Sequence, residues 1–253
     1  MRCLAAIRVM LPWQMGILML TLAMLVSTAA GQNCCGVGCH CCTCAGGPPC
    51  ASPIIIDTTG QGFQLTSAED GVIFDISGTG HPVLIAWTVP KAGNAFLALD
   101  RNHNGKIDSG KELFGNFTAQ PPCPDGGRTC LNGYRALAEF DKPENGGNGD
   151  GIIDSRDAVF SHLRLWIDQN HDGISQPKEL HTLPELGVYS LALHYEEEWL
   201  NDEFGNLFHY KAAVNPDSLD GTSKDGRWDY DVFFVFDADG NLPNAESDVS
   251  EKN

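Results

Sequence analysis

From residue 52 onward, short apolar runs alternate with turns rich in Asp, Asn and Gly. Short runs of β-branched and aromatic residues bounded by such turns are typical of β-strands. The polar stretch Asn201–Asn206 separates two of these runs and predicts a C-terminal β-hairpin. The expected strands are Ile54–Asp57, Val72–Asp75, Val83–Trp87, Phe96–Asp100, Leu163–Asp168, Val188–Tyr195, Leu207–Val214 and Trp228–Phe236.

Two of the later strands have more specific patterns. Along residues 188–195, alternate positions are occupied by Tyr189, Leu191, Leu193 and Tyr195. Because side chains alternate across a strand, we expect these four on one face. The strand at 228–236 (WDYDVFFVF) is almost entirely apolar, which predicts that it is buried.

Helical signals are few, and each predicts a short helix. Asn132 is a candidate N-cap, and Pro177 stands near the first position of another helix. Ser155 is the candidate cap of a further helix, with Val159 and Phe160 facing inward. Strands and short helices together predict an α+β fold class in which strands dominate.

The first thirty residues have the pattern of an export signal. Arg2 and Arg8 precede the apolar run Gly16–Val26, which small residues follow up to Ala30. A charged start, an apolar middle and a small-residue exit are typical of a cleaved signal peptide. The alternative is a membrane anchor, but the run is shorter than the roughly 20 residues that span a bilayer. We therefore expect a secreted protein, extracellular or periplasmic.

Carboxylates dominate the charge of the chain. It has 33 Asp and Glu against 16 Lys and Arg, a formal net charge of −17, and 42% apolar residues. The apolar fraction is enough for a folded core. A surface this negative repels phosphate backbones and anionic lipid, so we expect no nucleic-acid partner and no membrane contact after signal cleavage. Carboxylates in turns beside Asn and Gly are suited to a hard cation.

Seven of the ten cysteines lie in a Gly- and Pro-rich stretch, residues 34–50. In an exported protein such a stretch is expected to be oxidised, and a metal–thiolate cluster is the alternative. Cys123 and Cys130 flank a separate turn and are expected to form a local disulfide. The remaining odd number means that one thiol stays free, pairs with another molecule or belongs to a metal site, so the stretch is a candidate contact for a protein or surface partner.

Three turns have the ligand pattern of a calcium loop, and we name them in chain order. Loop 1 covers residues 100–112, loop 2 residues 141–157 and loop 3 residues 168–179. Loop 3 matches the twelve-residue pattern throughout, with oxygen ligands at positions 1, 3, 5, 7, 9 and 12 and Gly173 at position 6. Ser175 replaces the usual apolar residue at position 8, which predicts a weaker bridge to a partner loop. The expected ligands of loop 3 are Asp168, Asn170, Asp172, the Ile174 carbonyl, Gln176 and Glu179.

Loop 1 has the same pattern with its glutamate one position late. Gly110 is expected to absorb the extra residue. The expected ligands are Asp100, Asn102, Asn104, Lys106 through its carbonyl, Asp108 and Glu112.

Loop 2 is interrupted by the insert KPENGG at 142–147. Asp141 supplies the first ligand if the insert bulges out, and Asn145 is the alternative. The expected ligands are Asp141, Asn148, Asp150, Asp154 and Asp157. Two further Asp-Gly turns, at 57–62 and 75–80, keep their glycines but have lost most oxygen ligands and are expected to be structural.

The stretches FLALDRNHNGKIDSGKELFGNF and LRLWIDQNHDGISQPKEL resemble the EF-hand-like calcium-binding segment of secreted bacterial proteins. The segment is similar to one in repeat-in-toxin exoproteins. The resemblance covers Ile54 to about Tyr195, is weaker onward to Phe236, and implies calcium-stabilised, β-rich structure. Some toxin relatives cut themselves at an Asp-Pro bond under calcium, and this chain contains no Asp-Pro dipeptide.

The sequence thus predicts a secreted calcium-binding protein, with Ca²⁺ as its cofactor. The expected organisation is a signal peptide (1–30), a Cys-rich segment (31–52), an EF-hand-like calcium-binding domain (53–237) and a disordered acidic tail (238–253). The alternatives are a glycan- or cell-wall-active hydrolase with structural calcium and a Cys-rich surface interaction protein. The acidic run Glu196–Glu198 would suit a hydrolase, but it is expected to be a solvated strand edge, and no residue is assigned a catalytic role.

Overall fold

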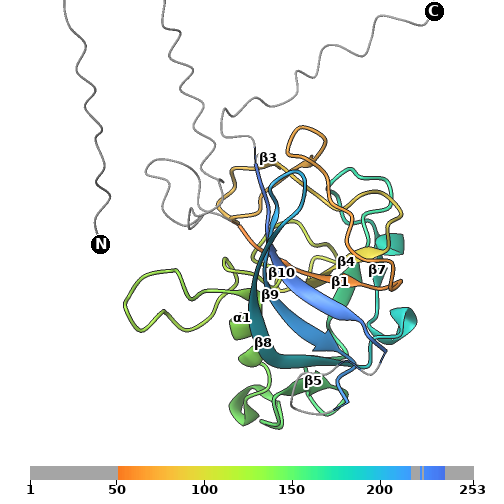
Figure 1. Ribbon diagram of the computed structural model, residues 1–253. Coiled ribbons are helices and arrows are strands. Elements are labelled where there is room, and N and C mark those ends of the chain that lie inside the picture. The colour runs from red at the N-terminus through yellow and green to blue at the C-terminus, as the bar shows by residue number, and fades with distance from the viewer. Residues whose placement is uncertain (1–50, 218–222, 224, 237–253) are drawn as a thin grey trace, which may run out of the picture. The chain divides into compact units, whose positions relative to one another are not determined.

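An eight-stranded antiparallel sheet forms the centre of the described part of the chain, residues 51–217, 223 and 225–236 (Figure 1). Its strand order is β5-β8-β9-β10-β1-β4-β6-β7, and β2 and β3 form a separate two-stranded sheet. The described residues belong to one compact unit, Cys34–Asn253. The strands of the large sheet are β1 (Ile54–Asp57), β4 (Asn94–Ala98), β5 (Ile152–Asp154), β6 (Arg164–Trp166), β7 (Leu180–His181), β8 (Ser190–Asn201), β9 (Leu207–Val214) and β10 (Trp228–Phe233), and those of the small sheet are β2 (Val72–Phe74) and β3 (Val83–Ile85).

The fold is all-β, and the predicted α+β class is wrong. The described residues contain one short α-helix, α1 (Gly133–Ala138), and the 3-10 turns η2 (Pro143–Asn145), η3 (Pro177–Glu179) and η4 (Pro184–Leu186). The Asn132 side chain accepts the Arg135 N–H, so this predicted cap is confirmed. None of the described helices has the length and apolar character needed to cross a bilayer.

The helix predicted after Ser155 does not form. Residues 155–162 make successive turns instead, with the Phe160 N–H donating to the Asp157 carbonyl. The Asp157 carboxylate accepts the Asn148 and Asp154 N–H groups, at 3.1 and 2.8 Å. These hydrogen bonds fix Asp157 as part of loop 2. The segment therefore follows the loop and does not form the helix that its local pattern predicts.

The sheet is covered on both faces, and this explains its continuous apolar strands. Along β1, Ile54 and Ile56 belong to one buried cluster and Ile55 to the other. The β4 side chains divide in the same way. A strand buried on both faces needs apolar residues at every position. The first cluster includes α1 residues and Ile153 of β5, and the second includes Trp87, Trp166 and Ile107.

The C-terminal hairpin is confirmed, with one correction. Strands β8 and β9 pair across the turn at 202–206 and lie beside β10 (Figure 1). Leu191 is buried, and Leu193 and Tyr195 pack against the first cluster. Tyr189 precedes β8 and is 62% exposed, so the predicted four-residue face is wrong at this position.

Two carboxylates lie buried in the middle of the sheet, on β10. Asp229 and Asp231 are 1% and 0% exposed. Asp229 accepts the Tyr134 hydroxyl at 2.6 Å, and Asp231 accepts the Gly133 N–H at 2.6 Å. The strand predicted at 228–236 is present over residues 228–233 and is mostly buried. Two of its positions are acidic, and their side chains accept hydrogen bonds from the first residues of α1.

The Cys123–Cys130 disulfide is present, with its Cα atoms 5.7 Å apart. The predicted signal peptide, the acidic tail and the cysteines at 34–50 lie outside the described residues.

Candidate metal-binding loops

Loop 3 connects the end of β6 to η3, and its two terminal carboxylates are buried. Asp168 accepts the Asp172 and Gly173 N–H groups at 3.2 and 2.9 Å. Glu179 accepts the Gln169 and Gln176 N–H groups at 3.1 and 3.3 Å, the latter as part of a capping box. The first carboxylate thus binds the middle of the loop, and the last one binds both its beginning and its end.

Loop 1 repeats these four hydrogen bonds. Asp100 accepts the Asn104 and Gly105 N–H groups at 3.1 and 2.8 Å. Glu112 accepts the N–H groups of Arg101 and Asp108 at 3.3 and 2.9 Å. The displaced glutamate therefore reaches the same two loop positions as Glu179 does in loop 3.

Gly110, which was expected to absorb the extra residue of loop 1, has a different role. Its φ is not positive, and a Cβ there would lie 1.7 Å from the Ile76 carbonyl oxygen. The Gly110 N–H donates to the Asp75 carbonyl at 2.9 Å. The glycine thus permits a close approach between loop 1 and the 75–80 turn.

Loop 2 has a similar set of four hydrogen bonds across its insert, with two of the four donors at neighbouring loop positions. Asp141 accepts the Gly149 and Gly151 N–H groups, both at 2.9 Å. At the other end of loop 2, the Asp157 carboxylate accepts the N–H groups of Asn148 and Asp154, as described above. Asn145 instead donates to the Glu139 carbonyl. Of the two first-position candidates, Asp141 takes the place that Asp168 has in loop 3, because the insert folds out as η2.

A left-handed backbone at positions 4 and 6 is common to all three loops and to the two turns expected to be structural. Gly and, less readily, short polar residues adopt this conformation. In the two turns, Asp57 and Asp75 accept the N–H groups of Gly62 and Gly80, both at 2.7 Å. The spacing of Asp with Gly five residues later is the sequence signal for this turn. The residues with positive φ are His103 and Gly105, Gly149 and Gly151, His171 and Gly173, Gly60 and Gly62, and Gly78 and Gly80.

The side chains at several of the remaining ligand positions hydrogen-bond to one another. Amide groups donate to the carboxylates: both Asn170 and Gln176 to Asp172 at 2.7 Å, and Asn104 to Asp108 at 2.8 Å. Among the described residues, no group of three or more His, Cys, Asp or Glu side chains is arranged to hold a metal ion. The structure thus joins the first and last carboxylates of each loop through the loop backbone, while side-chain amides of loops 1 and 3 hydrogen-bond to a carboxylate between them.

Local hydrogen bonds and burial shift the acidity of several of these carboxylates. Burial acts to raise the pKa of Asp172, but hydrogen bonds from Ile174, Asn170 and Gln176 bring it below its usual value. Burial raises the pKa of Glu112 and Asp157. Arg156 lowers the pKa of Asp154 by hydrogen bonding. In loop 2 a cation therefore already lies beside the ligands, since Arg156 also pairs with Asp150 at 2.6 Å.

Loops 1 and 3 are joined at their eighth positions. The Ser175 hydroxyl accepts the Ile107 N–H at 2.7 Å and donates to the Ile107 carbonyl at 3.1 Å. The bridge expected to be weak is therefore present in a side-chain form, with both groups buried. It pairs the two loops as neighbours.

Ser175→Ala should break this bridge and leave the Ile107 N–H and carbonyl buried without partners. A buried donor or acceptor left without a partner lowers the free energy of unfolding by about 1–3 kcal/mol. We expect a loss of about 2 kcal/mol in the free energy of unfolding, measured by urea denaturation in EDTA. Ser155→Ala, at an exposed position, is the control and should change it by less than ~0.5 kcal/mol. Equal values for the two variants would contradict the bridge.

Two residues outside loop 3 position it, and the sequence pattern did not indicate them. The buried Trp87 indole N–H donates to the Asp168 carboxylate at 2.9 Å. Both ring nitrogens of His171 lie within hydrogen-bond distance of backbone carbonyls, those of Thr88 at 3.0 Å and Asp70 at 2.7 Å. These contacts depend on chain segments about eighty and a hundred residues away, which no local motif encodes.

The acidic run considered for a hydrolase lies on β8. Glu196 and Glu197 are exposed, while Glu198 pairs with Lys211 and accepts the Tyr230 hydroxyl at 2.7 Å. Hydrogen bonds from these two partners lower the pKa of Glu198 against the effect of burial. Glu198 thus has the environment of a cross-strand ion pair.

Comparison with known protein families identifies the family of this chain. Residues 54–241, from the start of β1 to beyond β10, match the SPM domain. The chain belongs to the SPM domain family. The SPM domain therefore includes all three loops and the whole large sheet.

The chain is also similar to a curated protein, the iron-regulated protein FrpA of Neisseria meningitidis serogroup C. The two are 41% identical over 156 residues. The matched stretch is 61% of this chain but 13% of the length of FrpA, so the similarity concerns a small part of that relative.

Proposed function

We propose that this SPM domain protein is exported and binds Ca²⁺ through loops 1, 2 and 3, and that the bound ions stabilise its fold outside the cytoplasm. The observation that supports this most strongly is the repeated set of hydrogen bonds. In each loop, the first carboxylate accepts two backbone N–H groups of the loop, and the last carboxylate accepts two more. A turn of unrelated purpose has no need of the second carboxylate.

The donor set suits calcium in both number and kind. Each loop offers carboxylate, amide and backbone oxygens, which are the ligands that Ca²⁺ takes in groups of six to eight. Each carboxylate oxygen that accepts one N–H retains capacity for a further partner. The ligands are those named for each loop above, and a bound ion would supply positive charge between carboxylates that otherwise repel one another.

The amide contacts within the loops are compatible with this function. Asn170, Gln176 and Asn104 place amide hydrogens against carboxylates, where a cation would otherwise neutralise the charge. Rotating a side-chain amide by half a turn exchanges its hydrogens for its oxygen. The same side chains thus satisfy the carboxylates without calcium and supply ligands with it.

In this proposal, the calcium sites act after export of the protein. The N-terminal pattern predicts a signal peptide, and the similarity to FrpA supports an extracellular location. Calcium loops of extracellular modules bind with dissociation constants of roughly 0.1–1 mM. An ion that binds only the folded chain stabilises it by mass action, so the fold would gain stability where calcium is abundant. We propose further that the loops are EF-hand-like and similar to those of repeat-in-toxin exoproteins.

A calcium titration of the full chain tests this function. After dialysis against EDTA, isothermal titration calorimetry should show saturable heat with Ca²⁺ in the range of about 0.1–1 mM. Native mass spectrometry should show up to three bound ions, one for each loop. Magnesium is the control and should bind more weakly, because it requires shorter, octahedral coordination. If neither heat nor bound ions are detected at a Ca²⁺ concentration about ten times the upper end of this range, the proposed function is excluded.

A further inference from the structure

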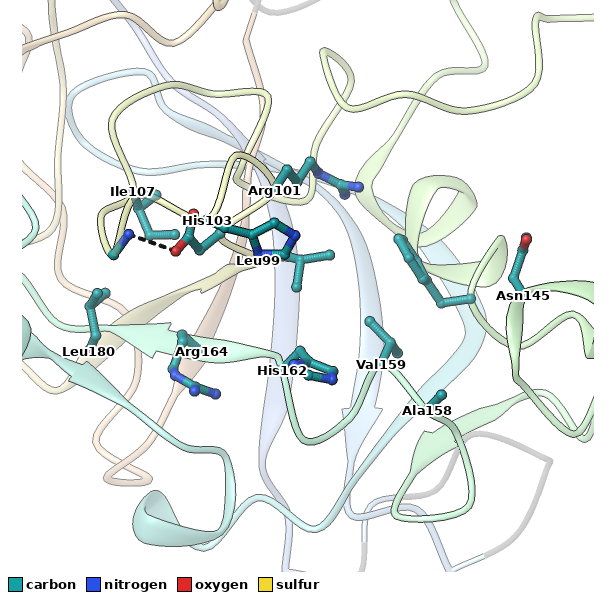
Figure 2. Close-up of a pocket in the computed structure, with 13 residues that line it drawn as sticks. Leu99, Arg101, His103, Ile107, Asn145, Ala158, Val159, His162, Arg164 and Leu180 are labelled. Carbon is teal, nitrogen blue, oxygen red and sulfur yellow. Dashed lines mark hydrogen bonds between the residues drawn. The ribbon is translucent and has the colours of Figure 1, made fainter.

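A groove lies between loop 1 and the segment that runs from Phe140 to Arg164. Its volume is about 610 Å³, within the range of small-molecule sites. Leu99 and His103 lie near its centre, with Arg101 along one edge and His162 and Arg164 on the opposite side (Figure 2). Its apolar lining consists of Leu99, Ile107, Phe140, Ala158, Val159 and Leu180.

The groove gathers basic side chains in a chain whose net charge is −17. Arg101, His103, His162 and Arg164 line it, and none of them makes an ion pair within the described part of the chain. Asp100 is the one acidic residue in the lining, and its two oxygens are turned to the loop 1 backbone. The lining is therefore cationic over an apolar floor.

Arg101, one of these basic groups, is held by two aromatic rings and a hydrogen bond. Its guanidinium carbon lies 5.2 Å from the centre of the Phe114 ring and 5.4 Å from that of Phe140. Its Nε donates to the Lys111 carbonyl at 2.9 Å. Its Nη2 is buried and has no hydrogen-bond partner among the described residues. The Glu112 carboxylate acts on this guanidinium through its charge, but Nη2 itself, at the edge of the groove, lacks an acceptor.

We propose that this groove binds a small amphipathic carboxylate, whose charged group pairs with Arg101 and whose apolar body lies on the floor formed by Leu99, Val159 and Leu180. A carboxylate matches the planar fork of a guanidinium, and the apolar floor excludes a purely polar anion. The basic side chains across the groove add attraction for negative charge. This site goes beyond calcium binding and does not require it.

Decanoate is the probe for the test, with 1-decanol and acetate as controls for its two halves. Titration calorimetry on the full chain should show saturable binding of decanoate and at least tenfold weaker binding of either control. Arg101→Met should weaken decanoate binding about tenfold or more, because it removes the charged donors but keeps an apolar stem. Arg128→Met is the matched control, since Arg128 also lies over a phenylalanine ring but outside the groove, and should bind decanoate as the parent chain does.

Two further variants keep the test decisive if Arg101→Met unfolds. Arg164→Met should also weaken decanoate binding, and Ala158→Trp should block it by filling the groove from an exposed wall position. Equal binding of decanoate and 1-decanol, or unchanged binding in all three groove variants, would overturn the proposal. Each titration is made in EDTA and in calcium, so that failure of the calcium sites and failure of the groove are separate results.

Discussion

Glu179→Gln should remove most of the calcium-dependent stabilisation that loop 3 provides. Glu179 is fully buried and accepts N–H groups from both ends of its loop, so its charge lies where a ligand must close the shell. A calcium concentration 100 times the dissociation constant stabilises a folded chain by about 2.7 kcal/mol per site. For a chain of this size, that corresponds to a shift of roughly 5–10 °C in melting temperature.

The measurement is differential scanning calorimetry, with and without EDTA, on the parent chain and on two variants. Asp75→Asn is the control, because the 75–80 turn has the loop backbone without the closing carboxylate. The difference between calcium and EDTA should fall by about 5–10 °C in Glu179→Gln and stay near the parent value in Asp75→Asn. Equal losses in the two variants would contradict the assignment of loop 3 as a site.

The second large effect is expected from the buried pair on β10. Burial raises the pKa of Asp229 to about 7 and that of Asp231 to about 6, although hydrogen bonds from Tyr134, Ser52 and Gly133 oppose the rise. The folded chain then binds protons more readily than the unfolded chain, whose aspartates titrate near 3.8. Stability is therefore highest below that value and falls as the pH rises through 6 and 7.

For Asp229 alone, the difference between folded and unfolded pKa corresponds to about 4 kcal/mol. We expect the free energy of unfolding in EDTA to fall by that order between pH 4.5 and pH 8, as measured by urea denaturation. The double variant Asp229→Asn, Asp231→Asn should show a much flatter profile, because neither amide titrates. A parent profile in which the free energy of unfolding rises across this window would contradict the raised pKa values of these two buried carboxylates.

The two effects have opposite signs and can be measured separately. Calcium ligands must be ionised, so calcium-dependent stability should decrease as the pH falls. The buried pair on β10 stabilises the fold as the pH falls. Measurement in EDTA isolates the second effect, and the difference between calcium and EDTA isolates the first.

Much of the sheet was predictable because its strands have strong local signals. The runs at 54–57 and 207–214 were predicted with the bounds that the structure has, since uninterrupted apolar residues end at polar turns. Strands β5 and β7 were missed because they are only a few residues long and lie inside or beside calcium-type loops. The helix predicted after Ser155 was wrong, because the local pattern contains no information on the hydrogen bond from Asn148 to the Asp157 carboxylate.

The loop ends were predictable for a similar reason. An Asp that accepts N–H groups four and five residues later makes a contact that the spacing itself encodes, and this holds for Asp100 and Asp168. For loop 2 the pattern left Asp141 and Asn145 open, because an insert changes the spacing without showing which way the chain bulges. Only the folded loop distinguishes the two.

By itself, the sequence determined which turns have the calcium-loop pattern, where the main strands run and which cysteines form the local disulfide. All of these depend on contacts within a few residues, for which spacing is sufficient information. Tertiary structure alone decided that the fold is all-β, that Trp87 holds Asp168, that Ser175 joins loops 1 and 3, and that Asp229 and Asp231 are buried beneath α1. These contacts join segments about seventy to a hundred residues apart, and burial raises the energetic cost of each polar group that lacks a partner.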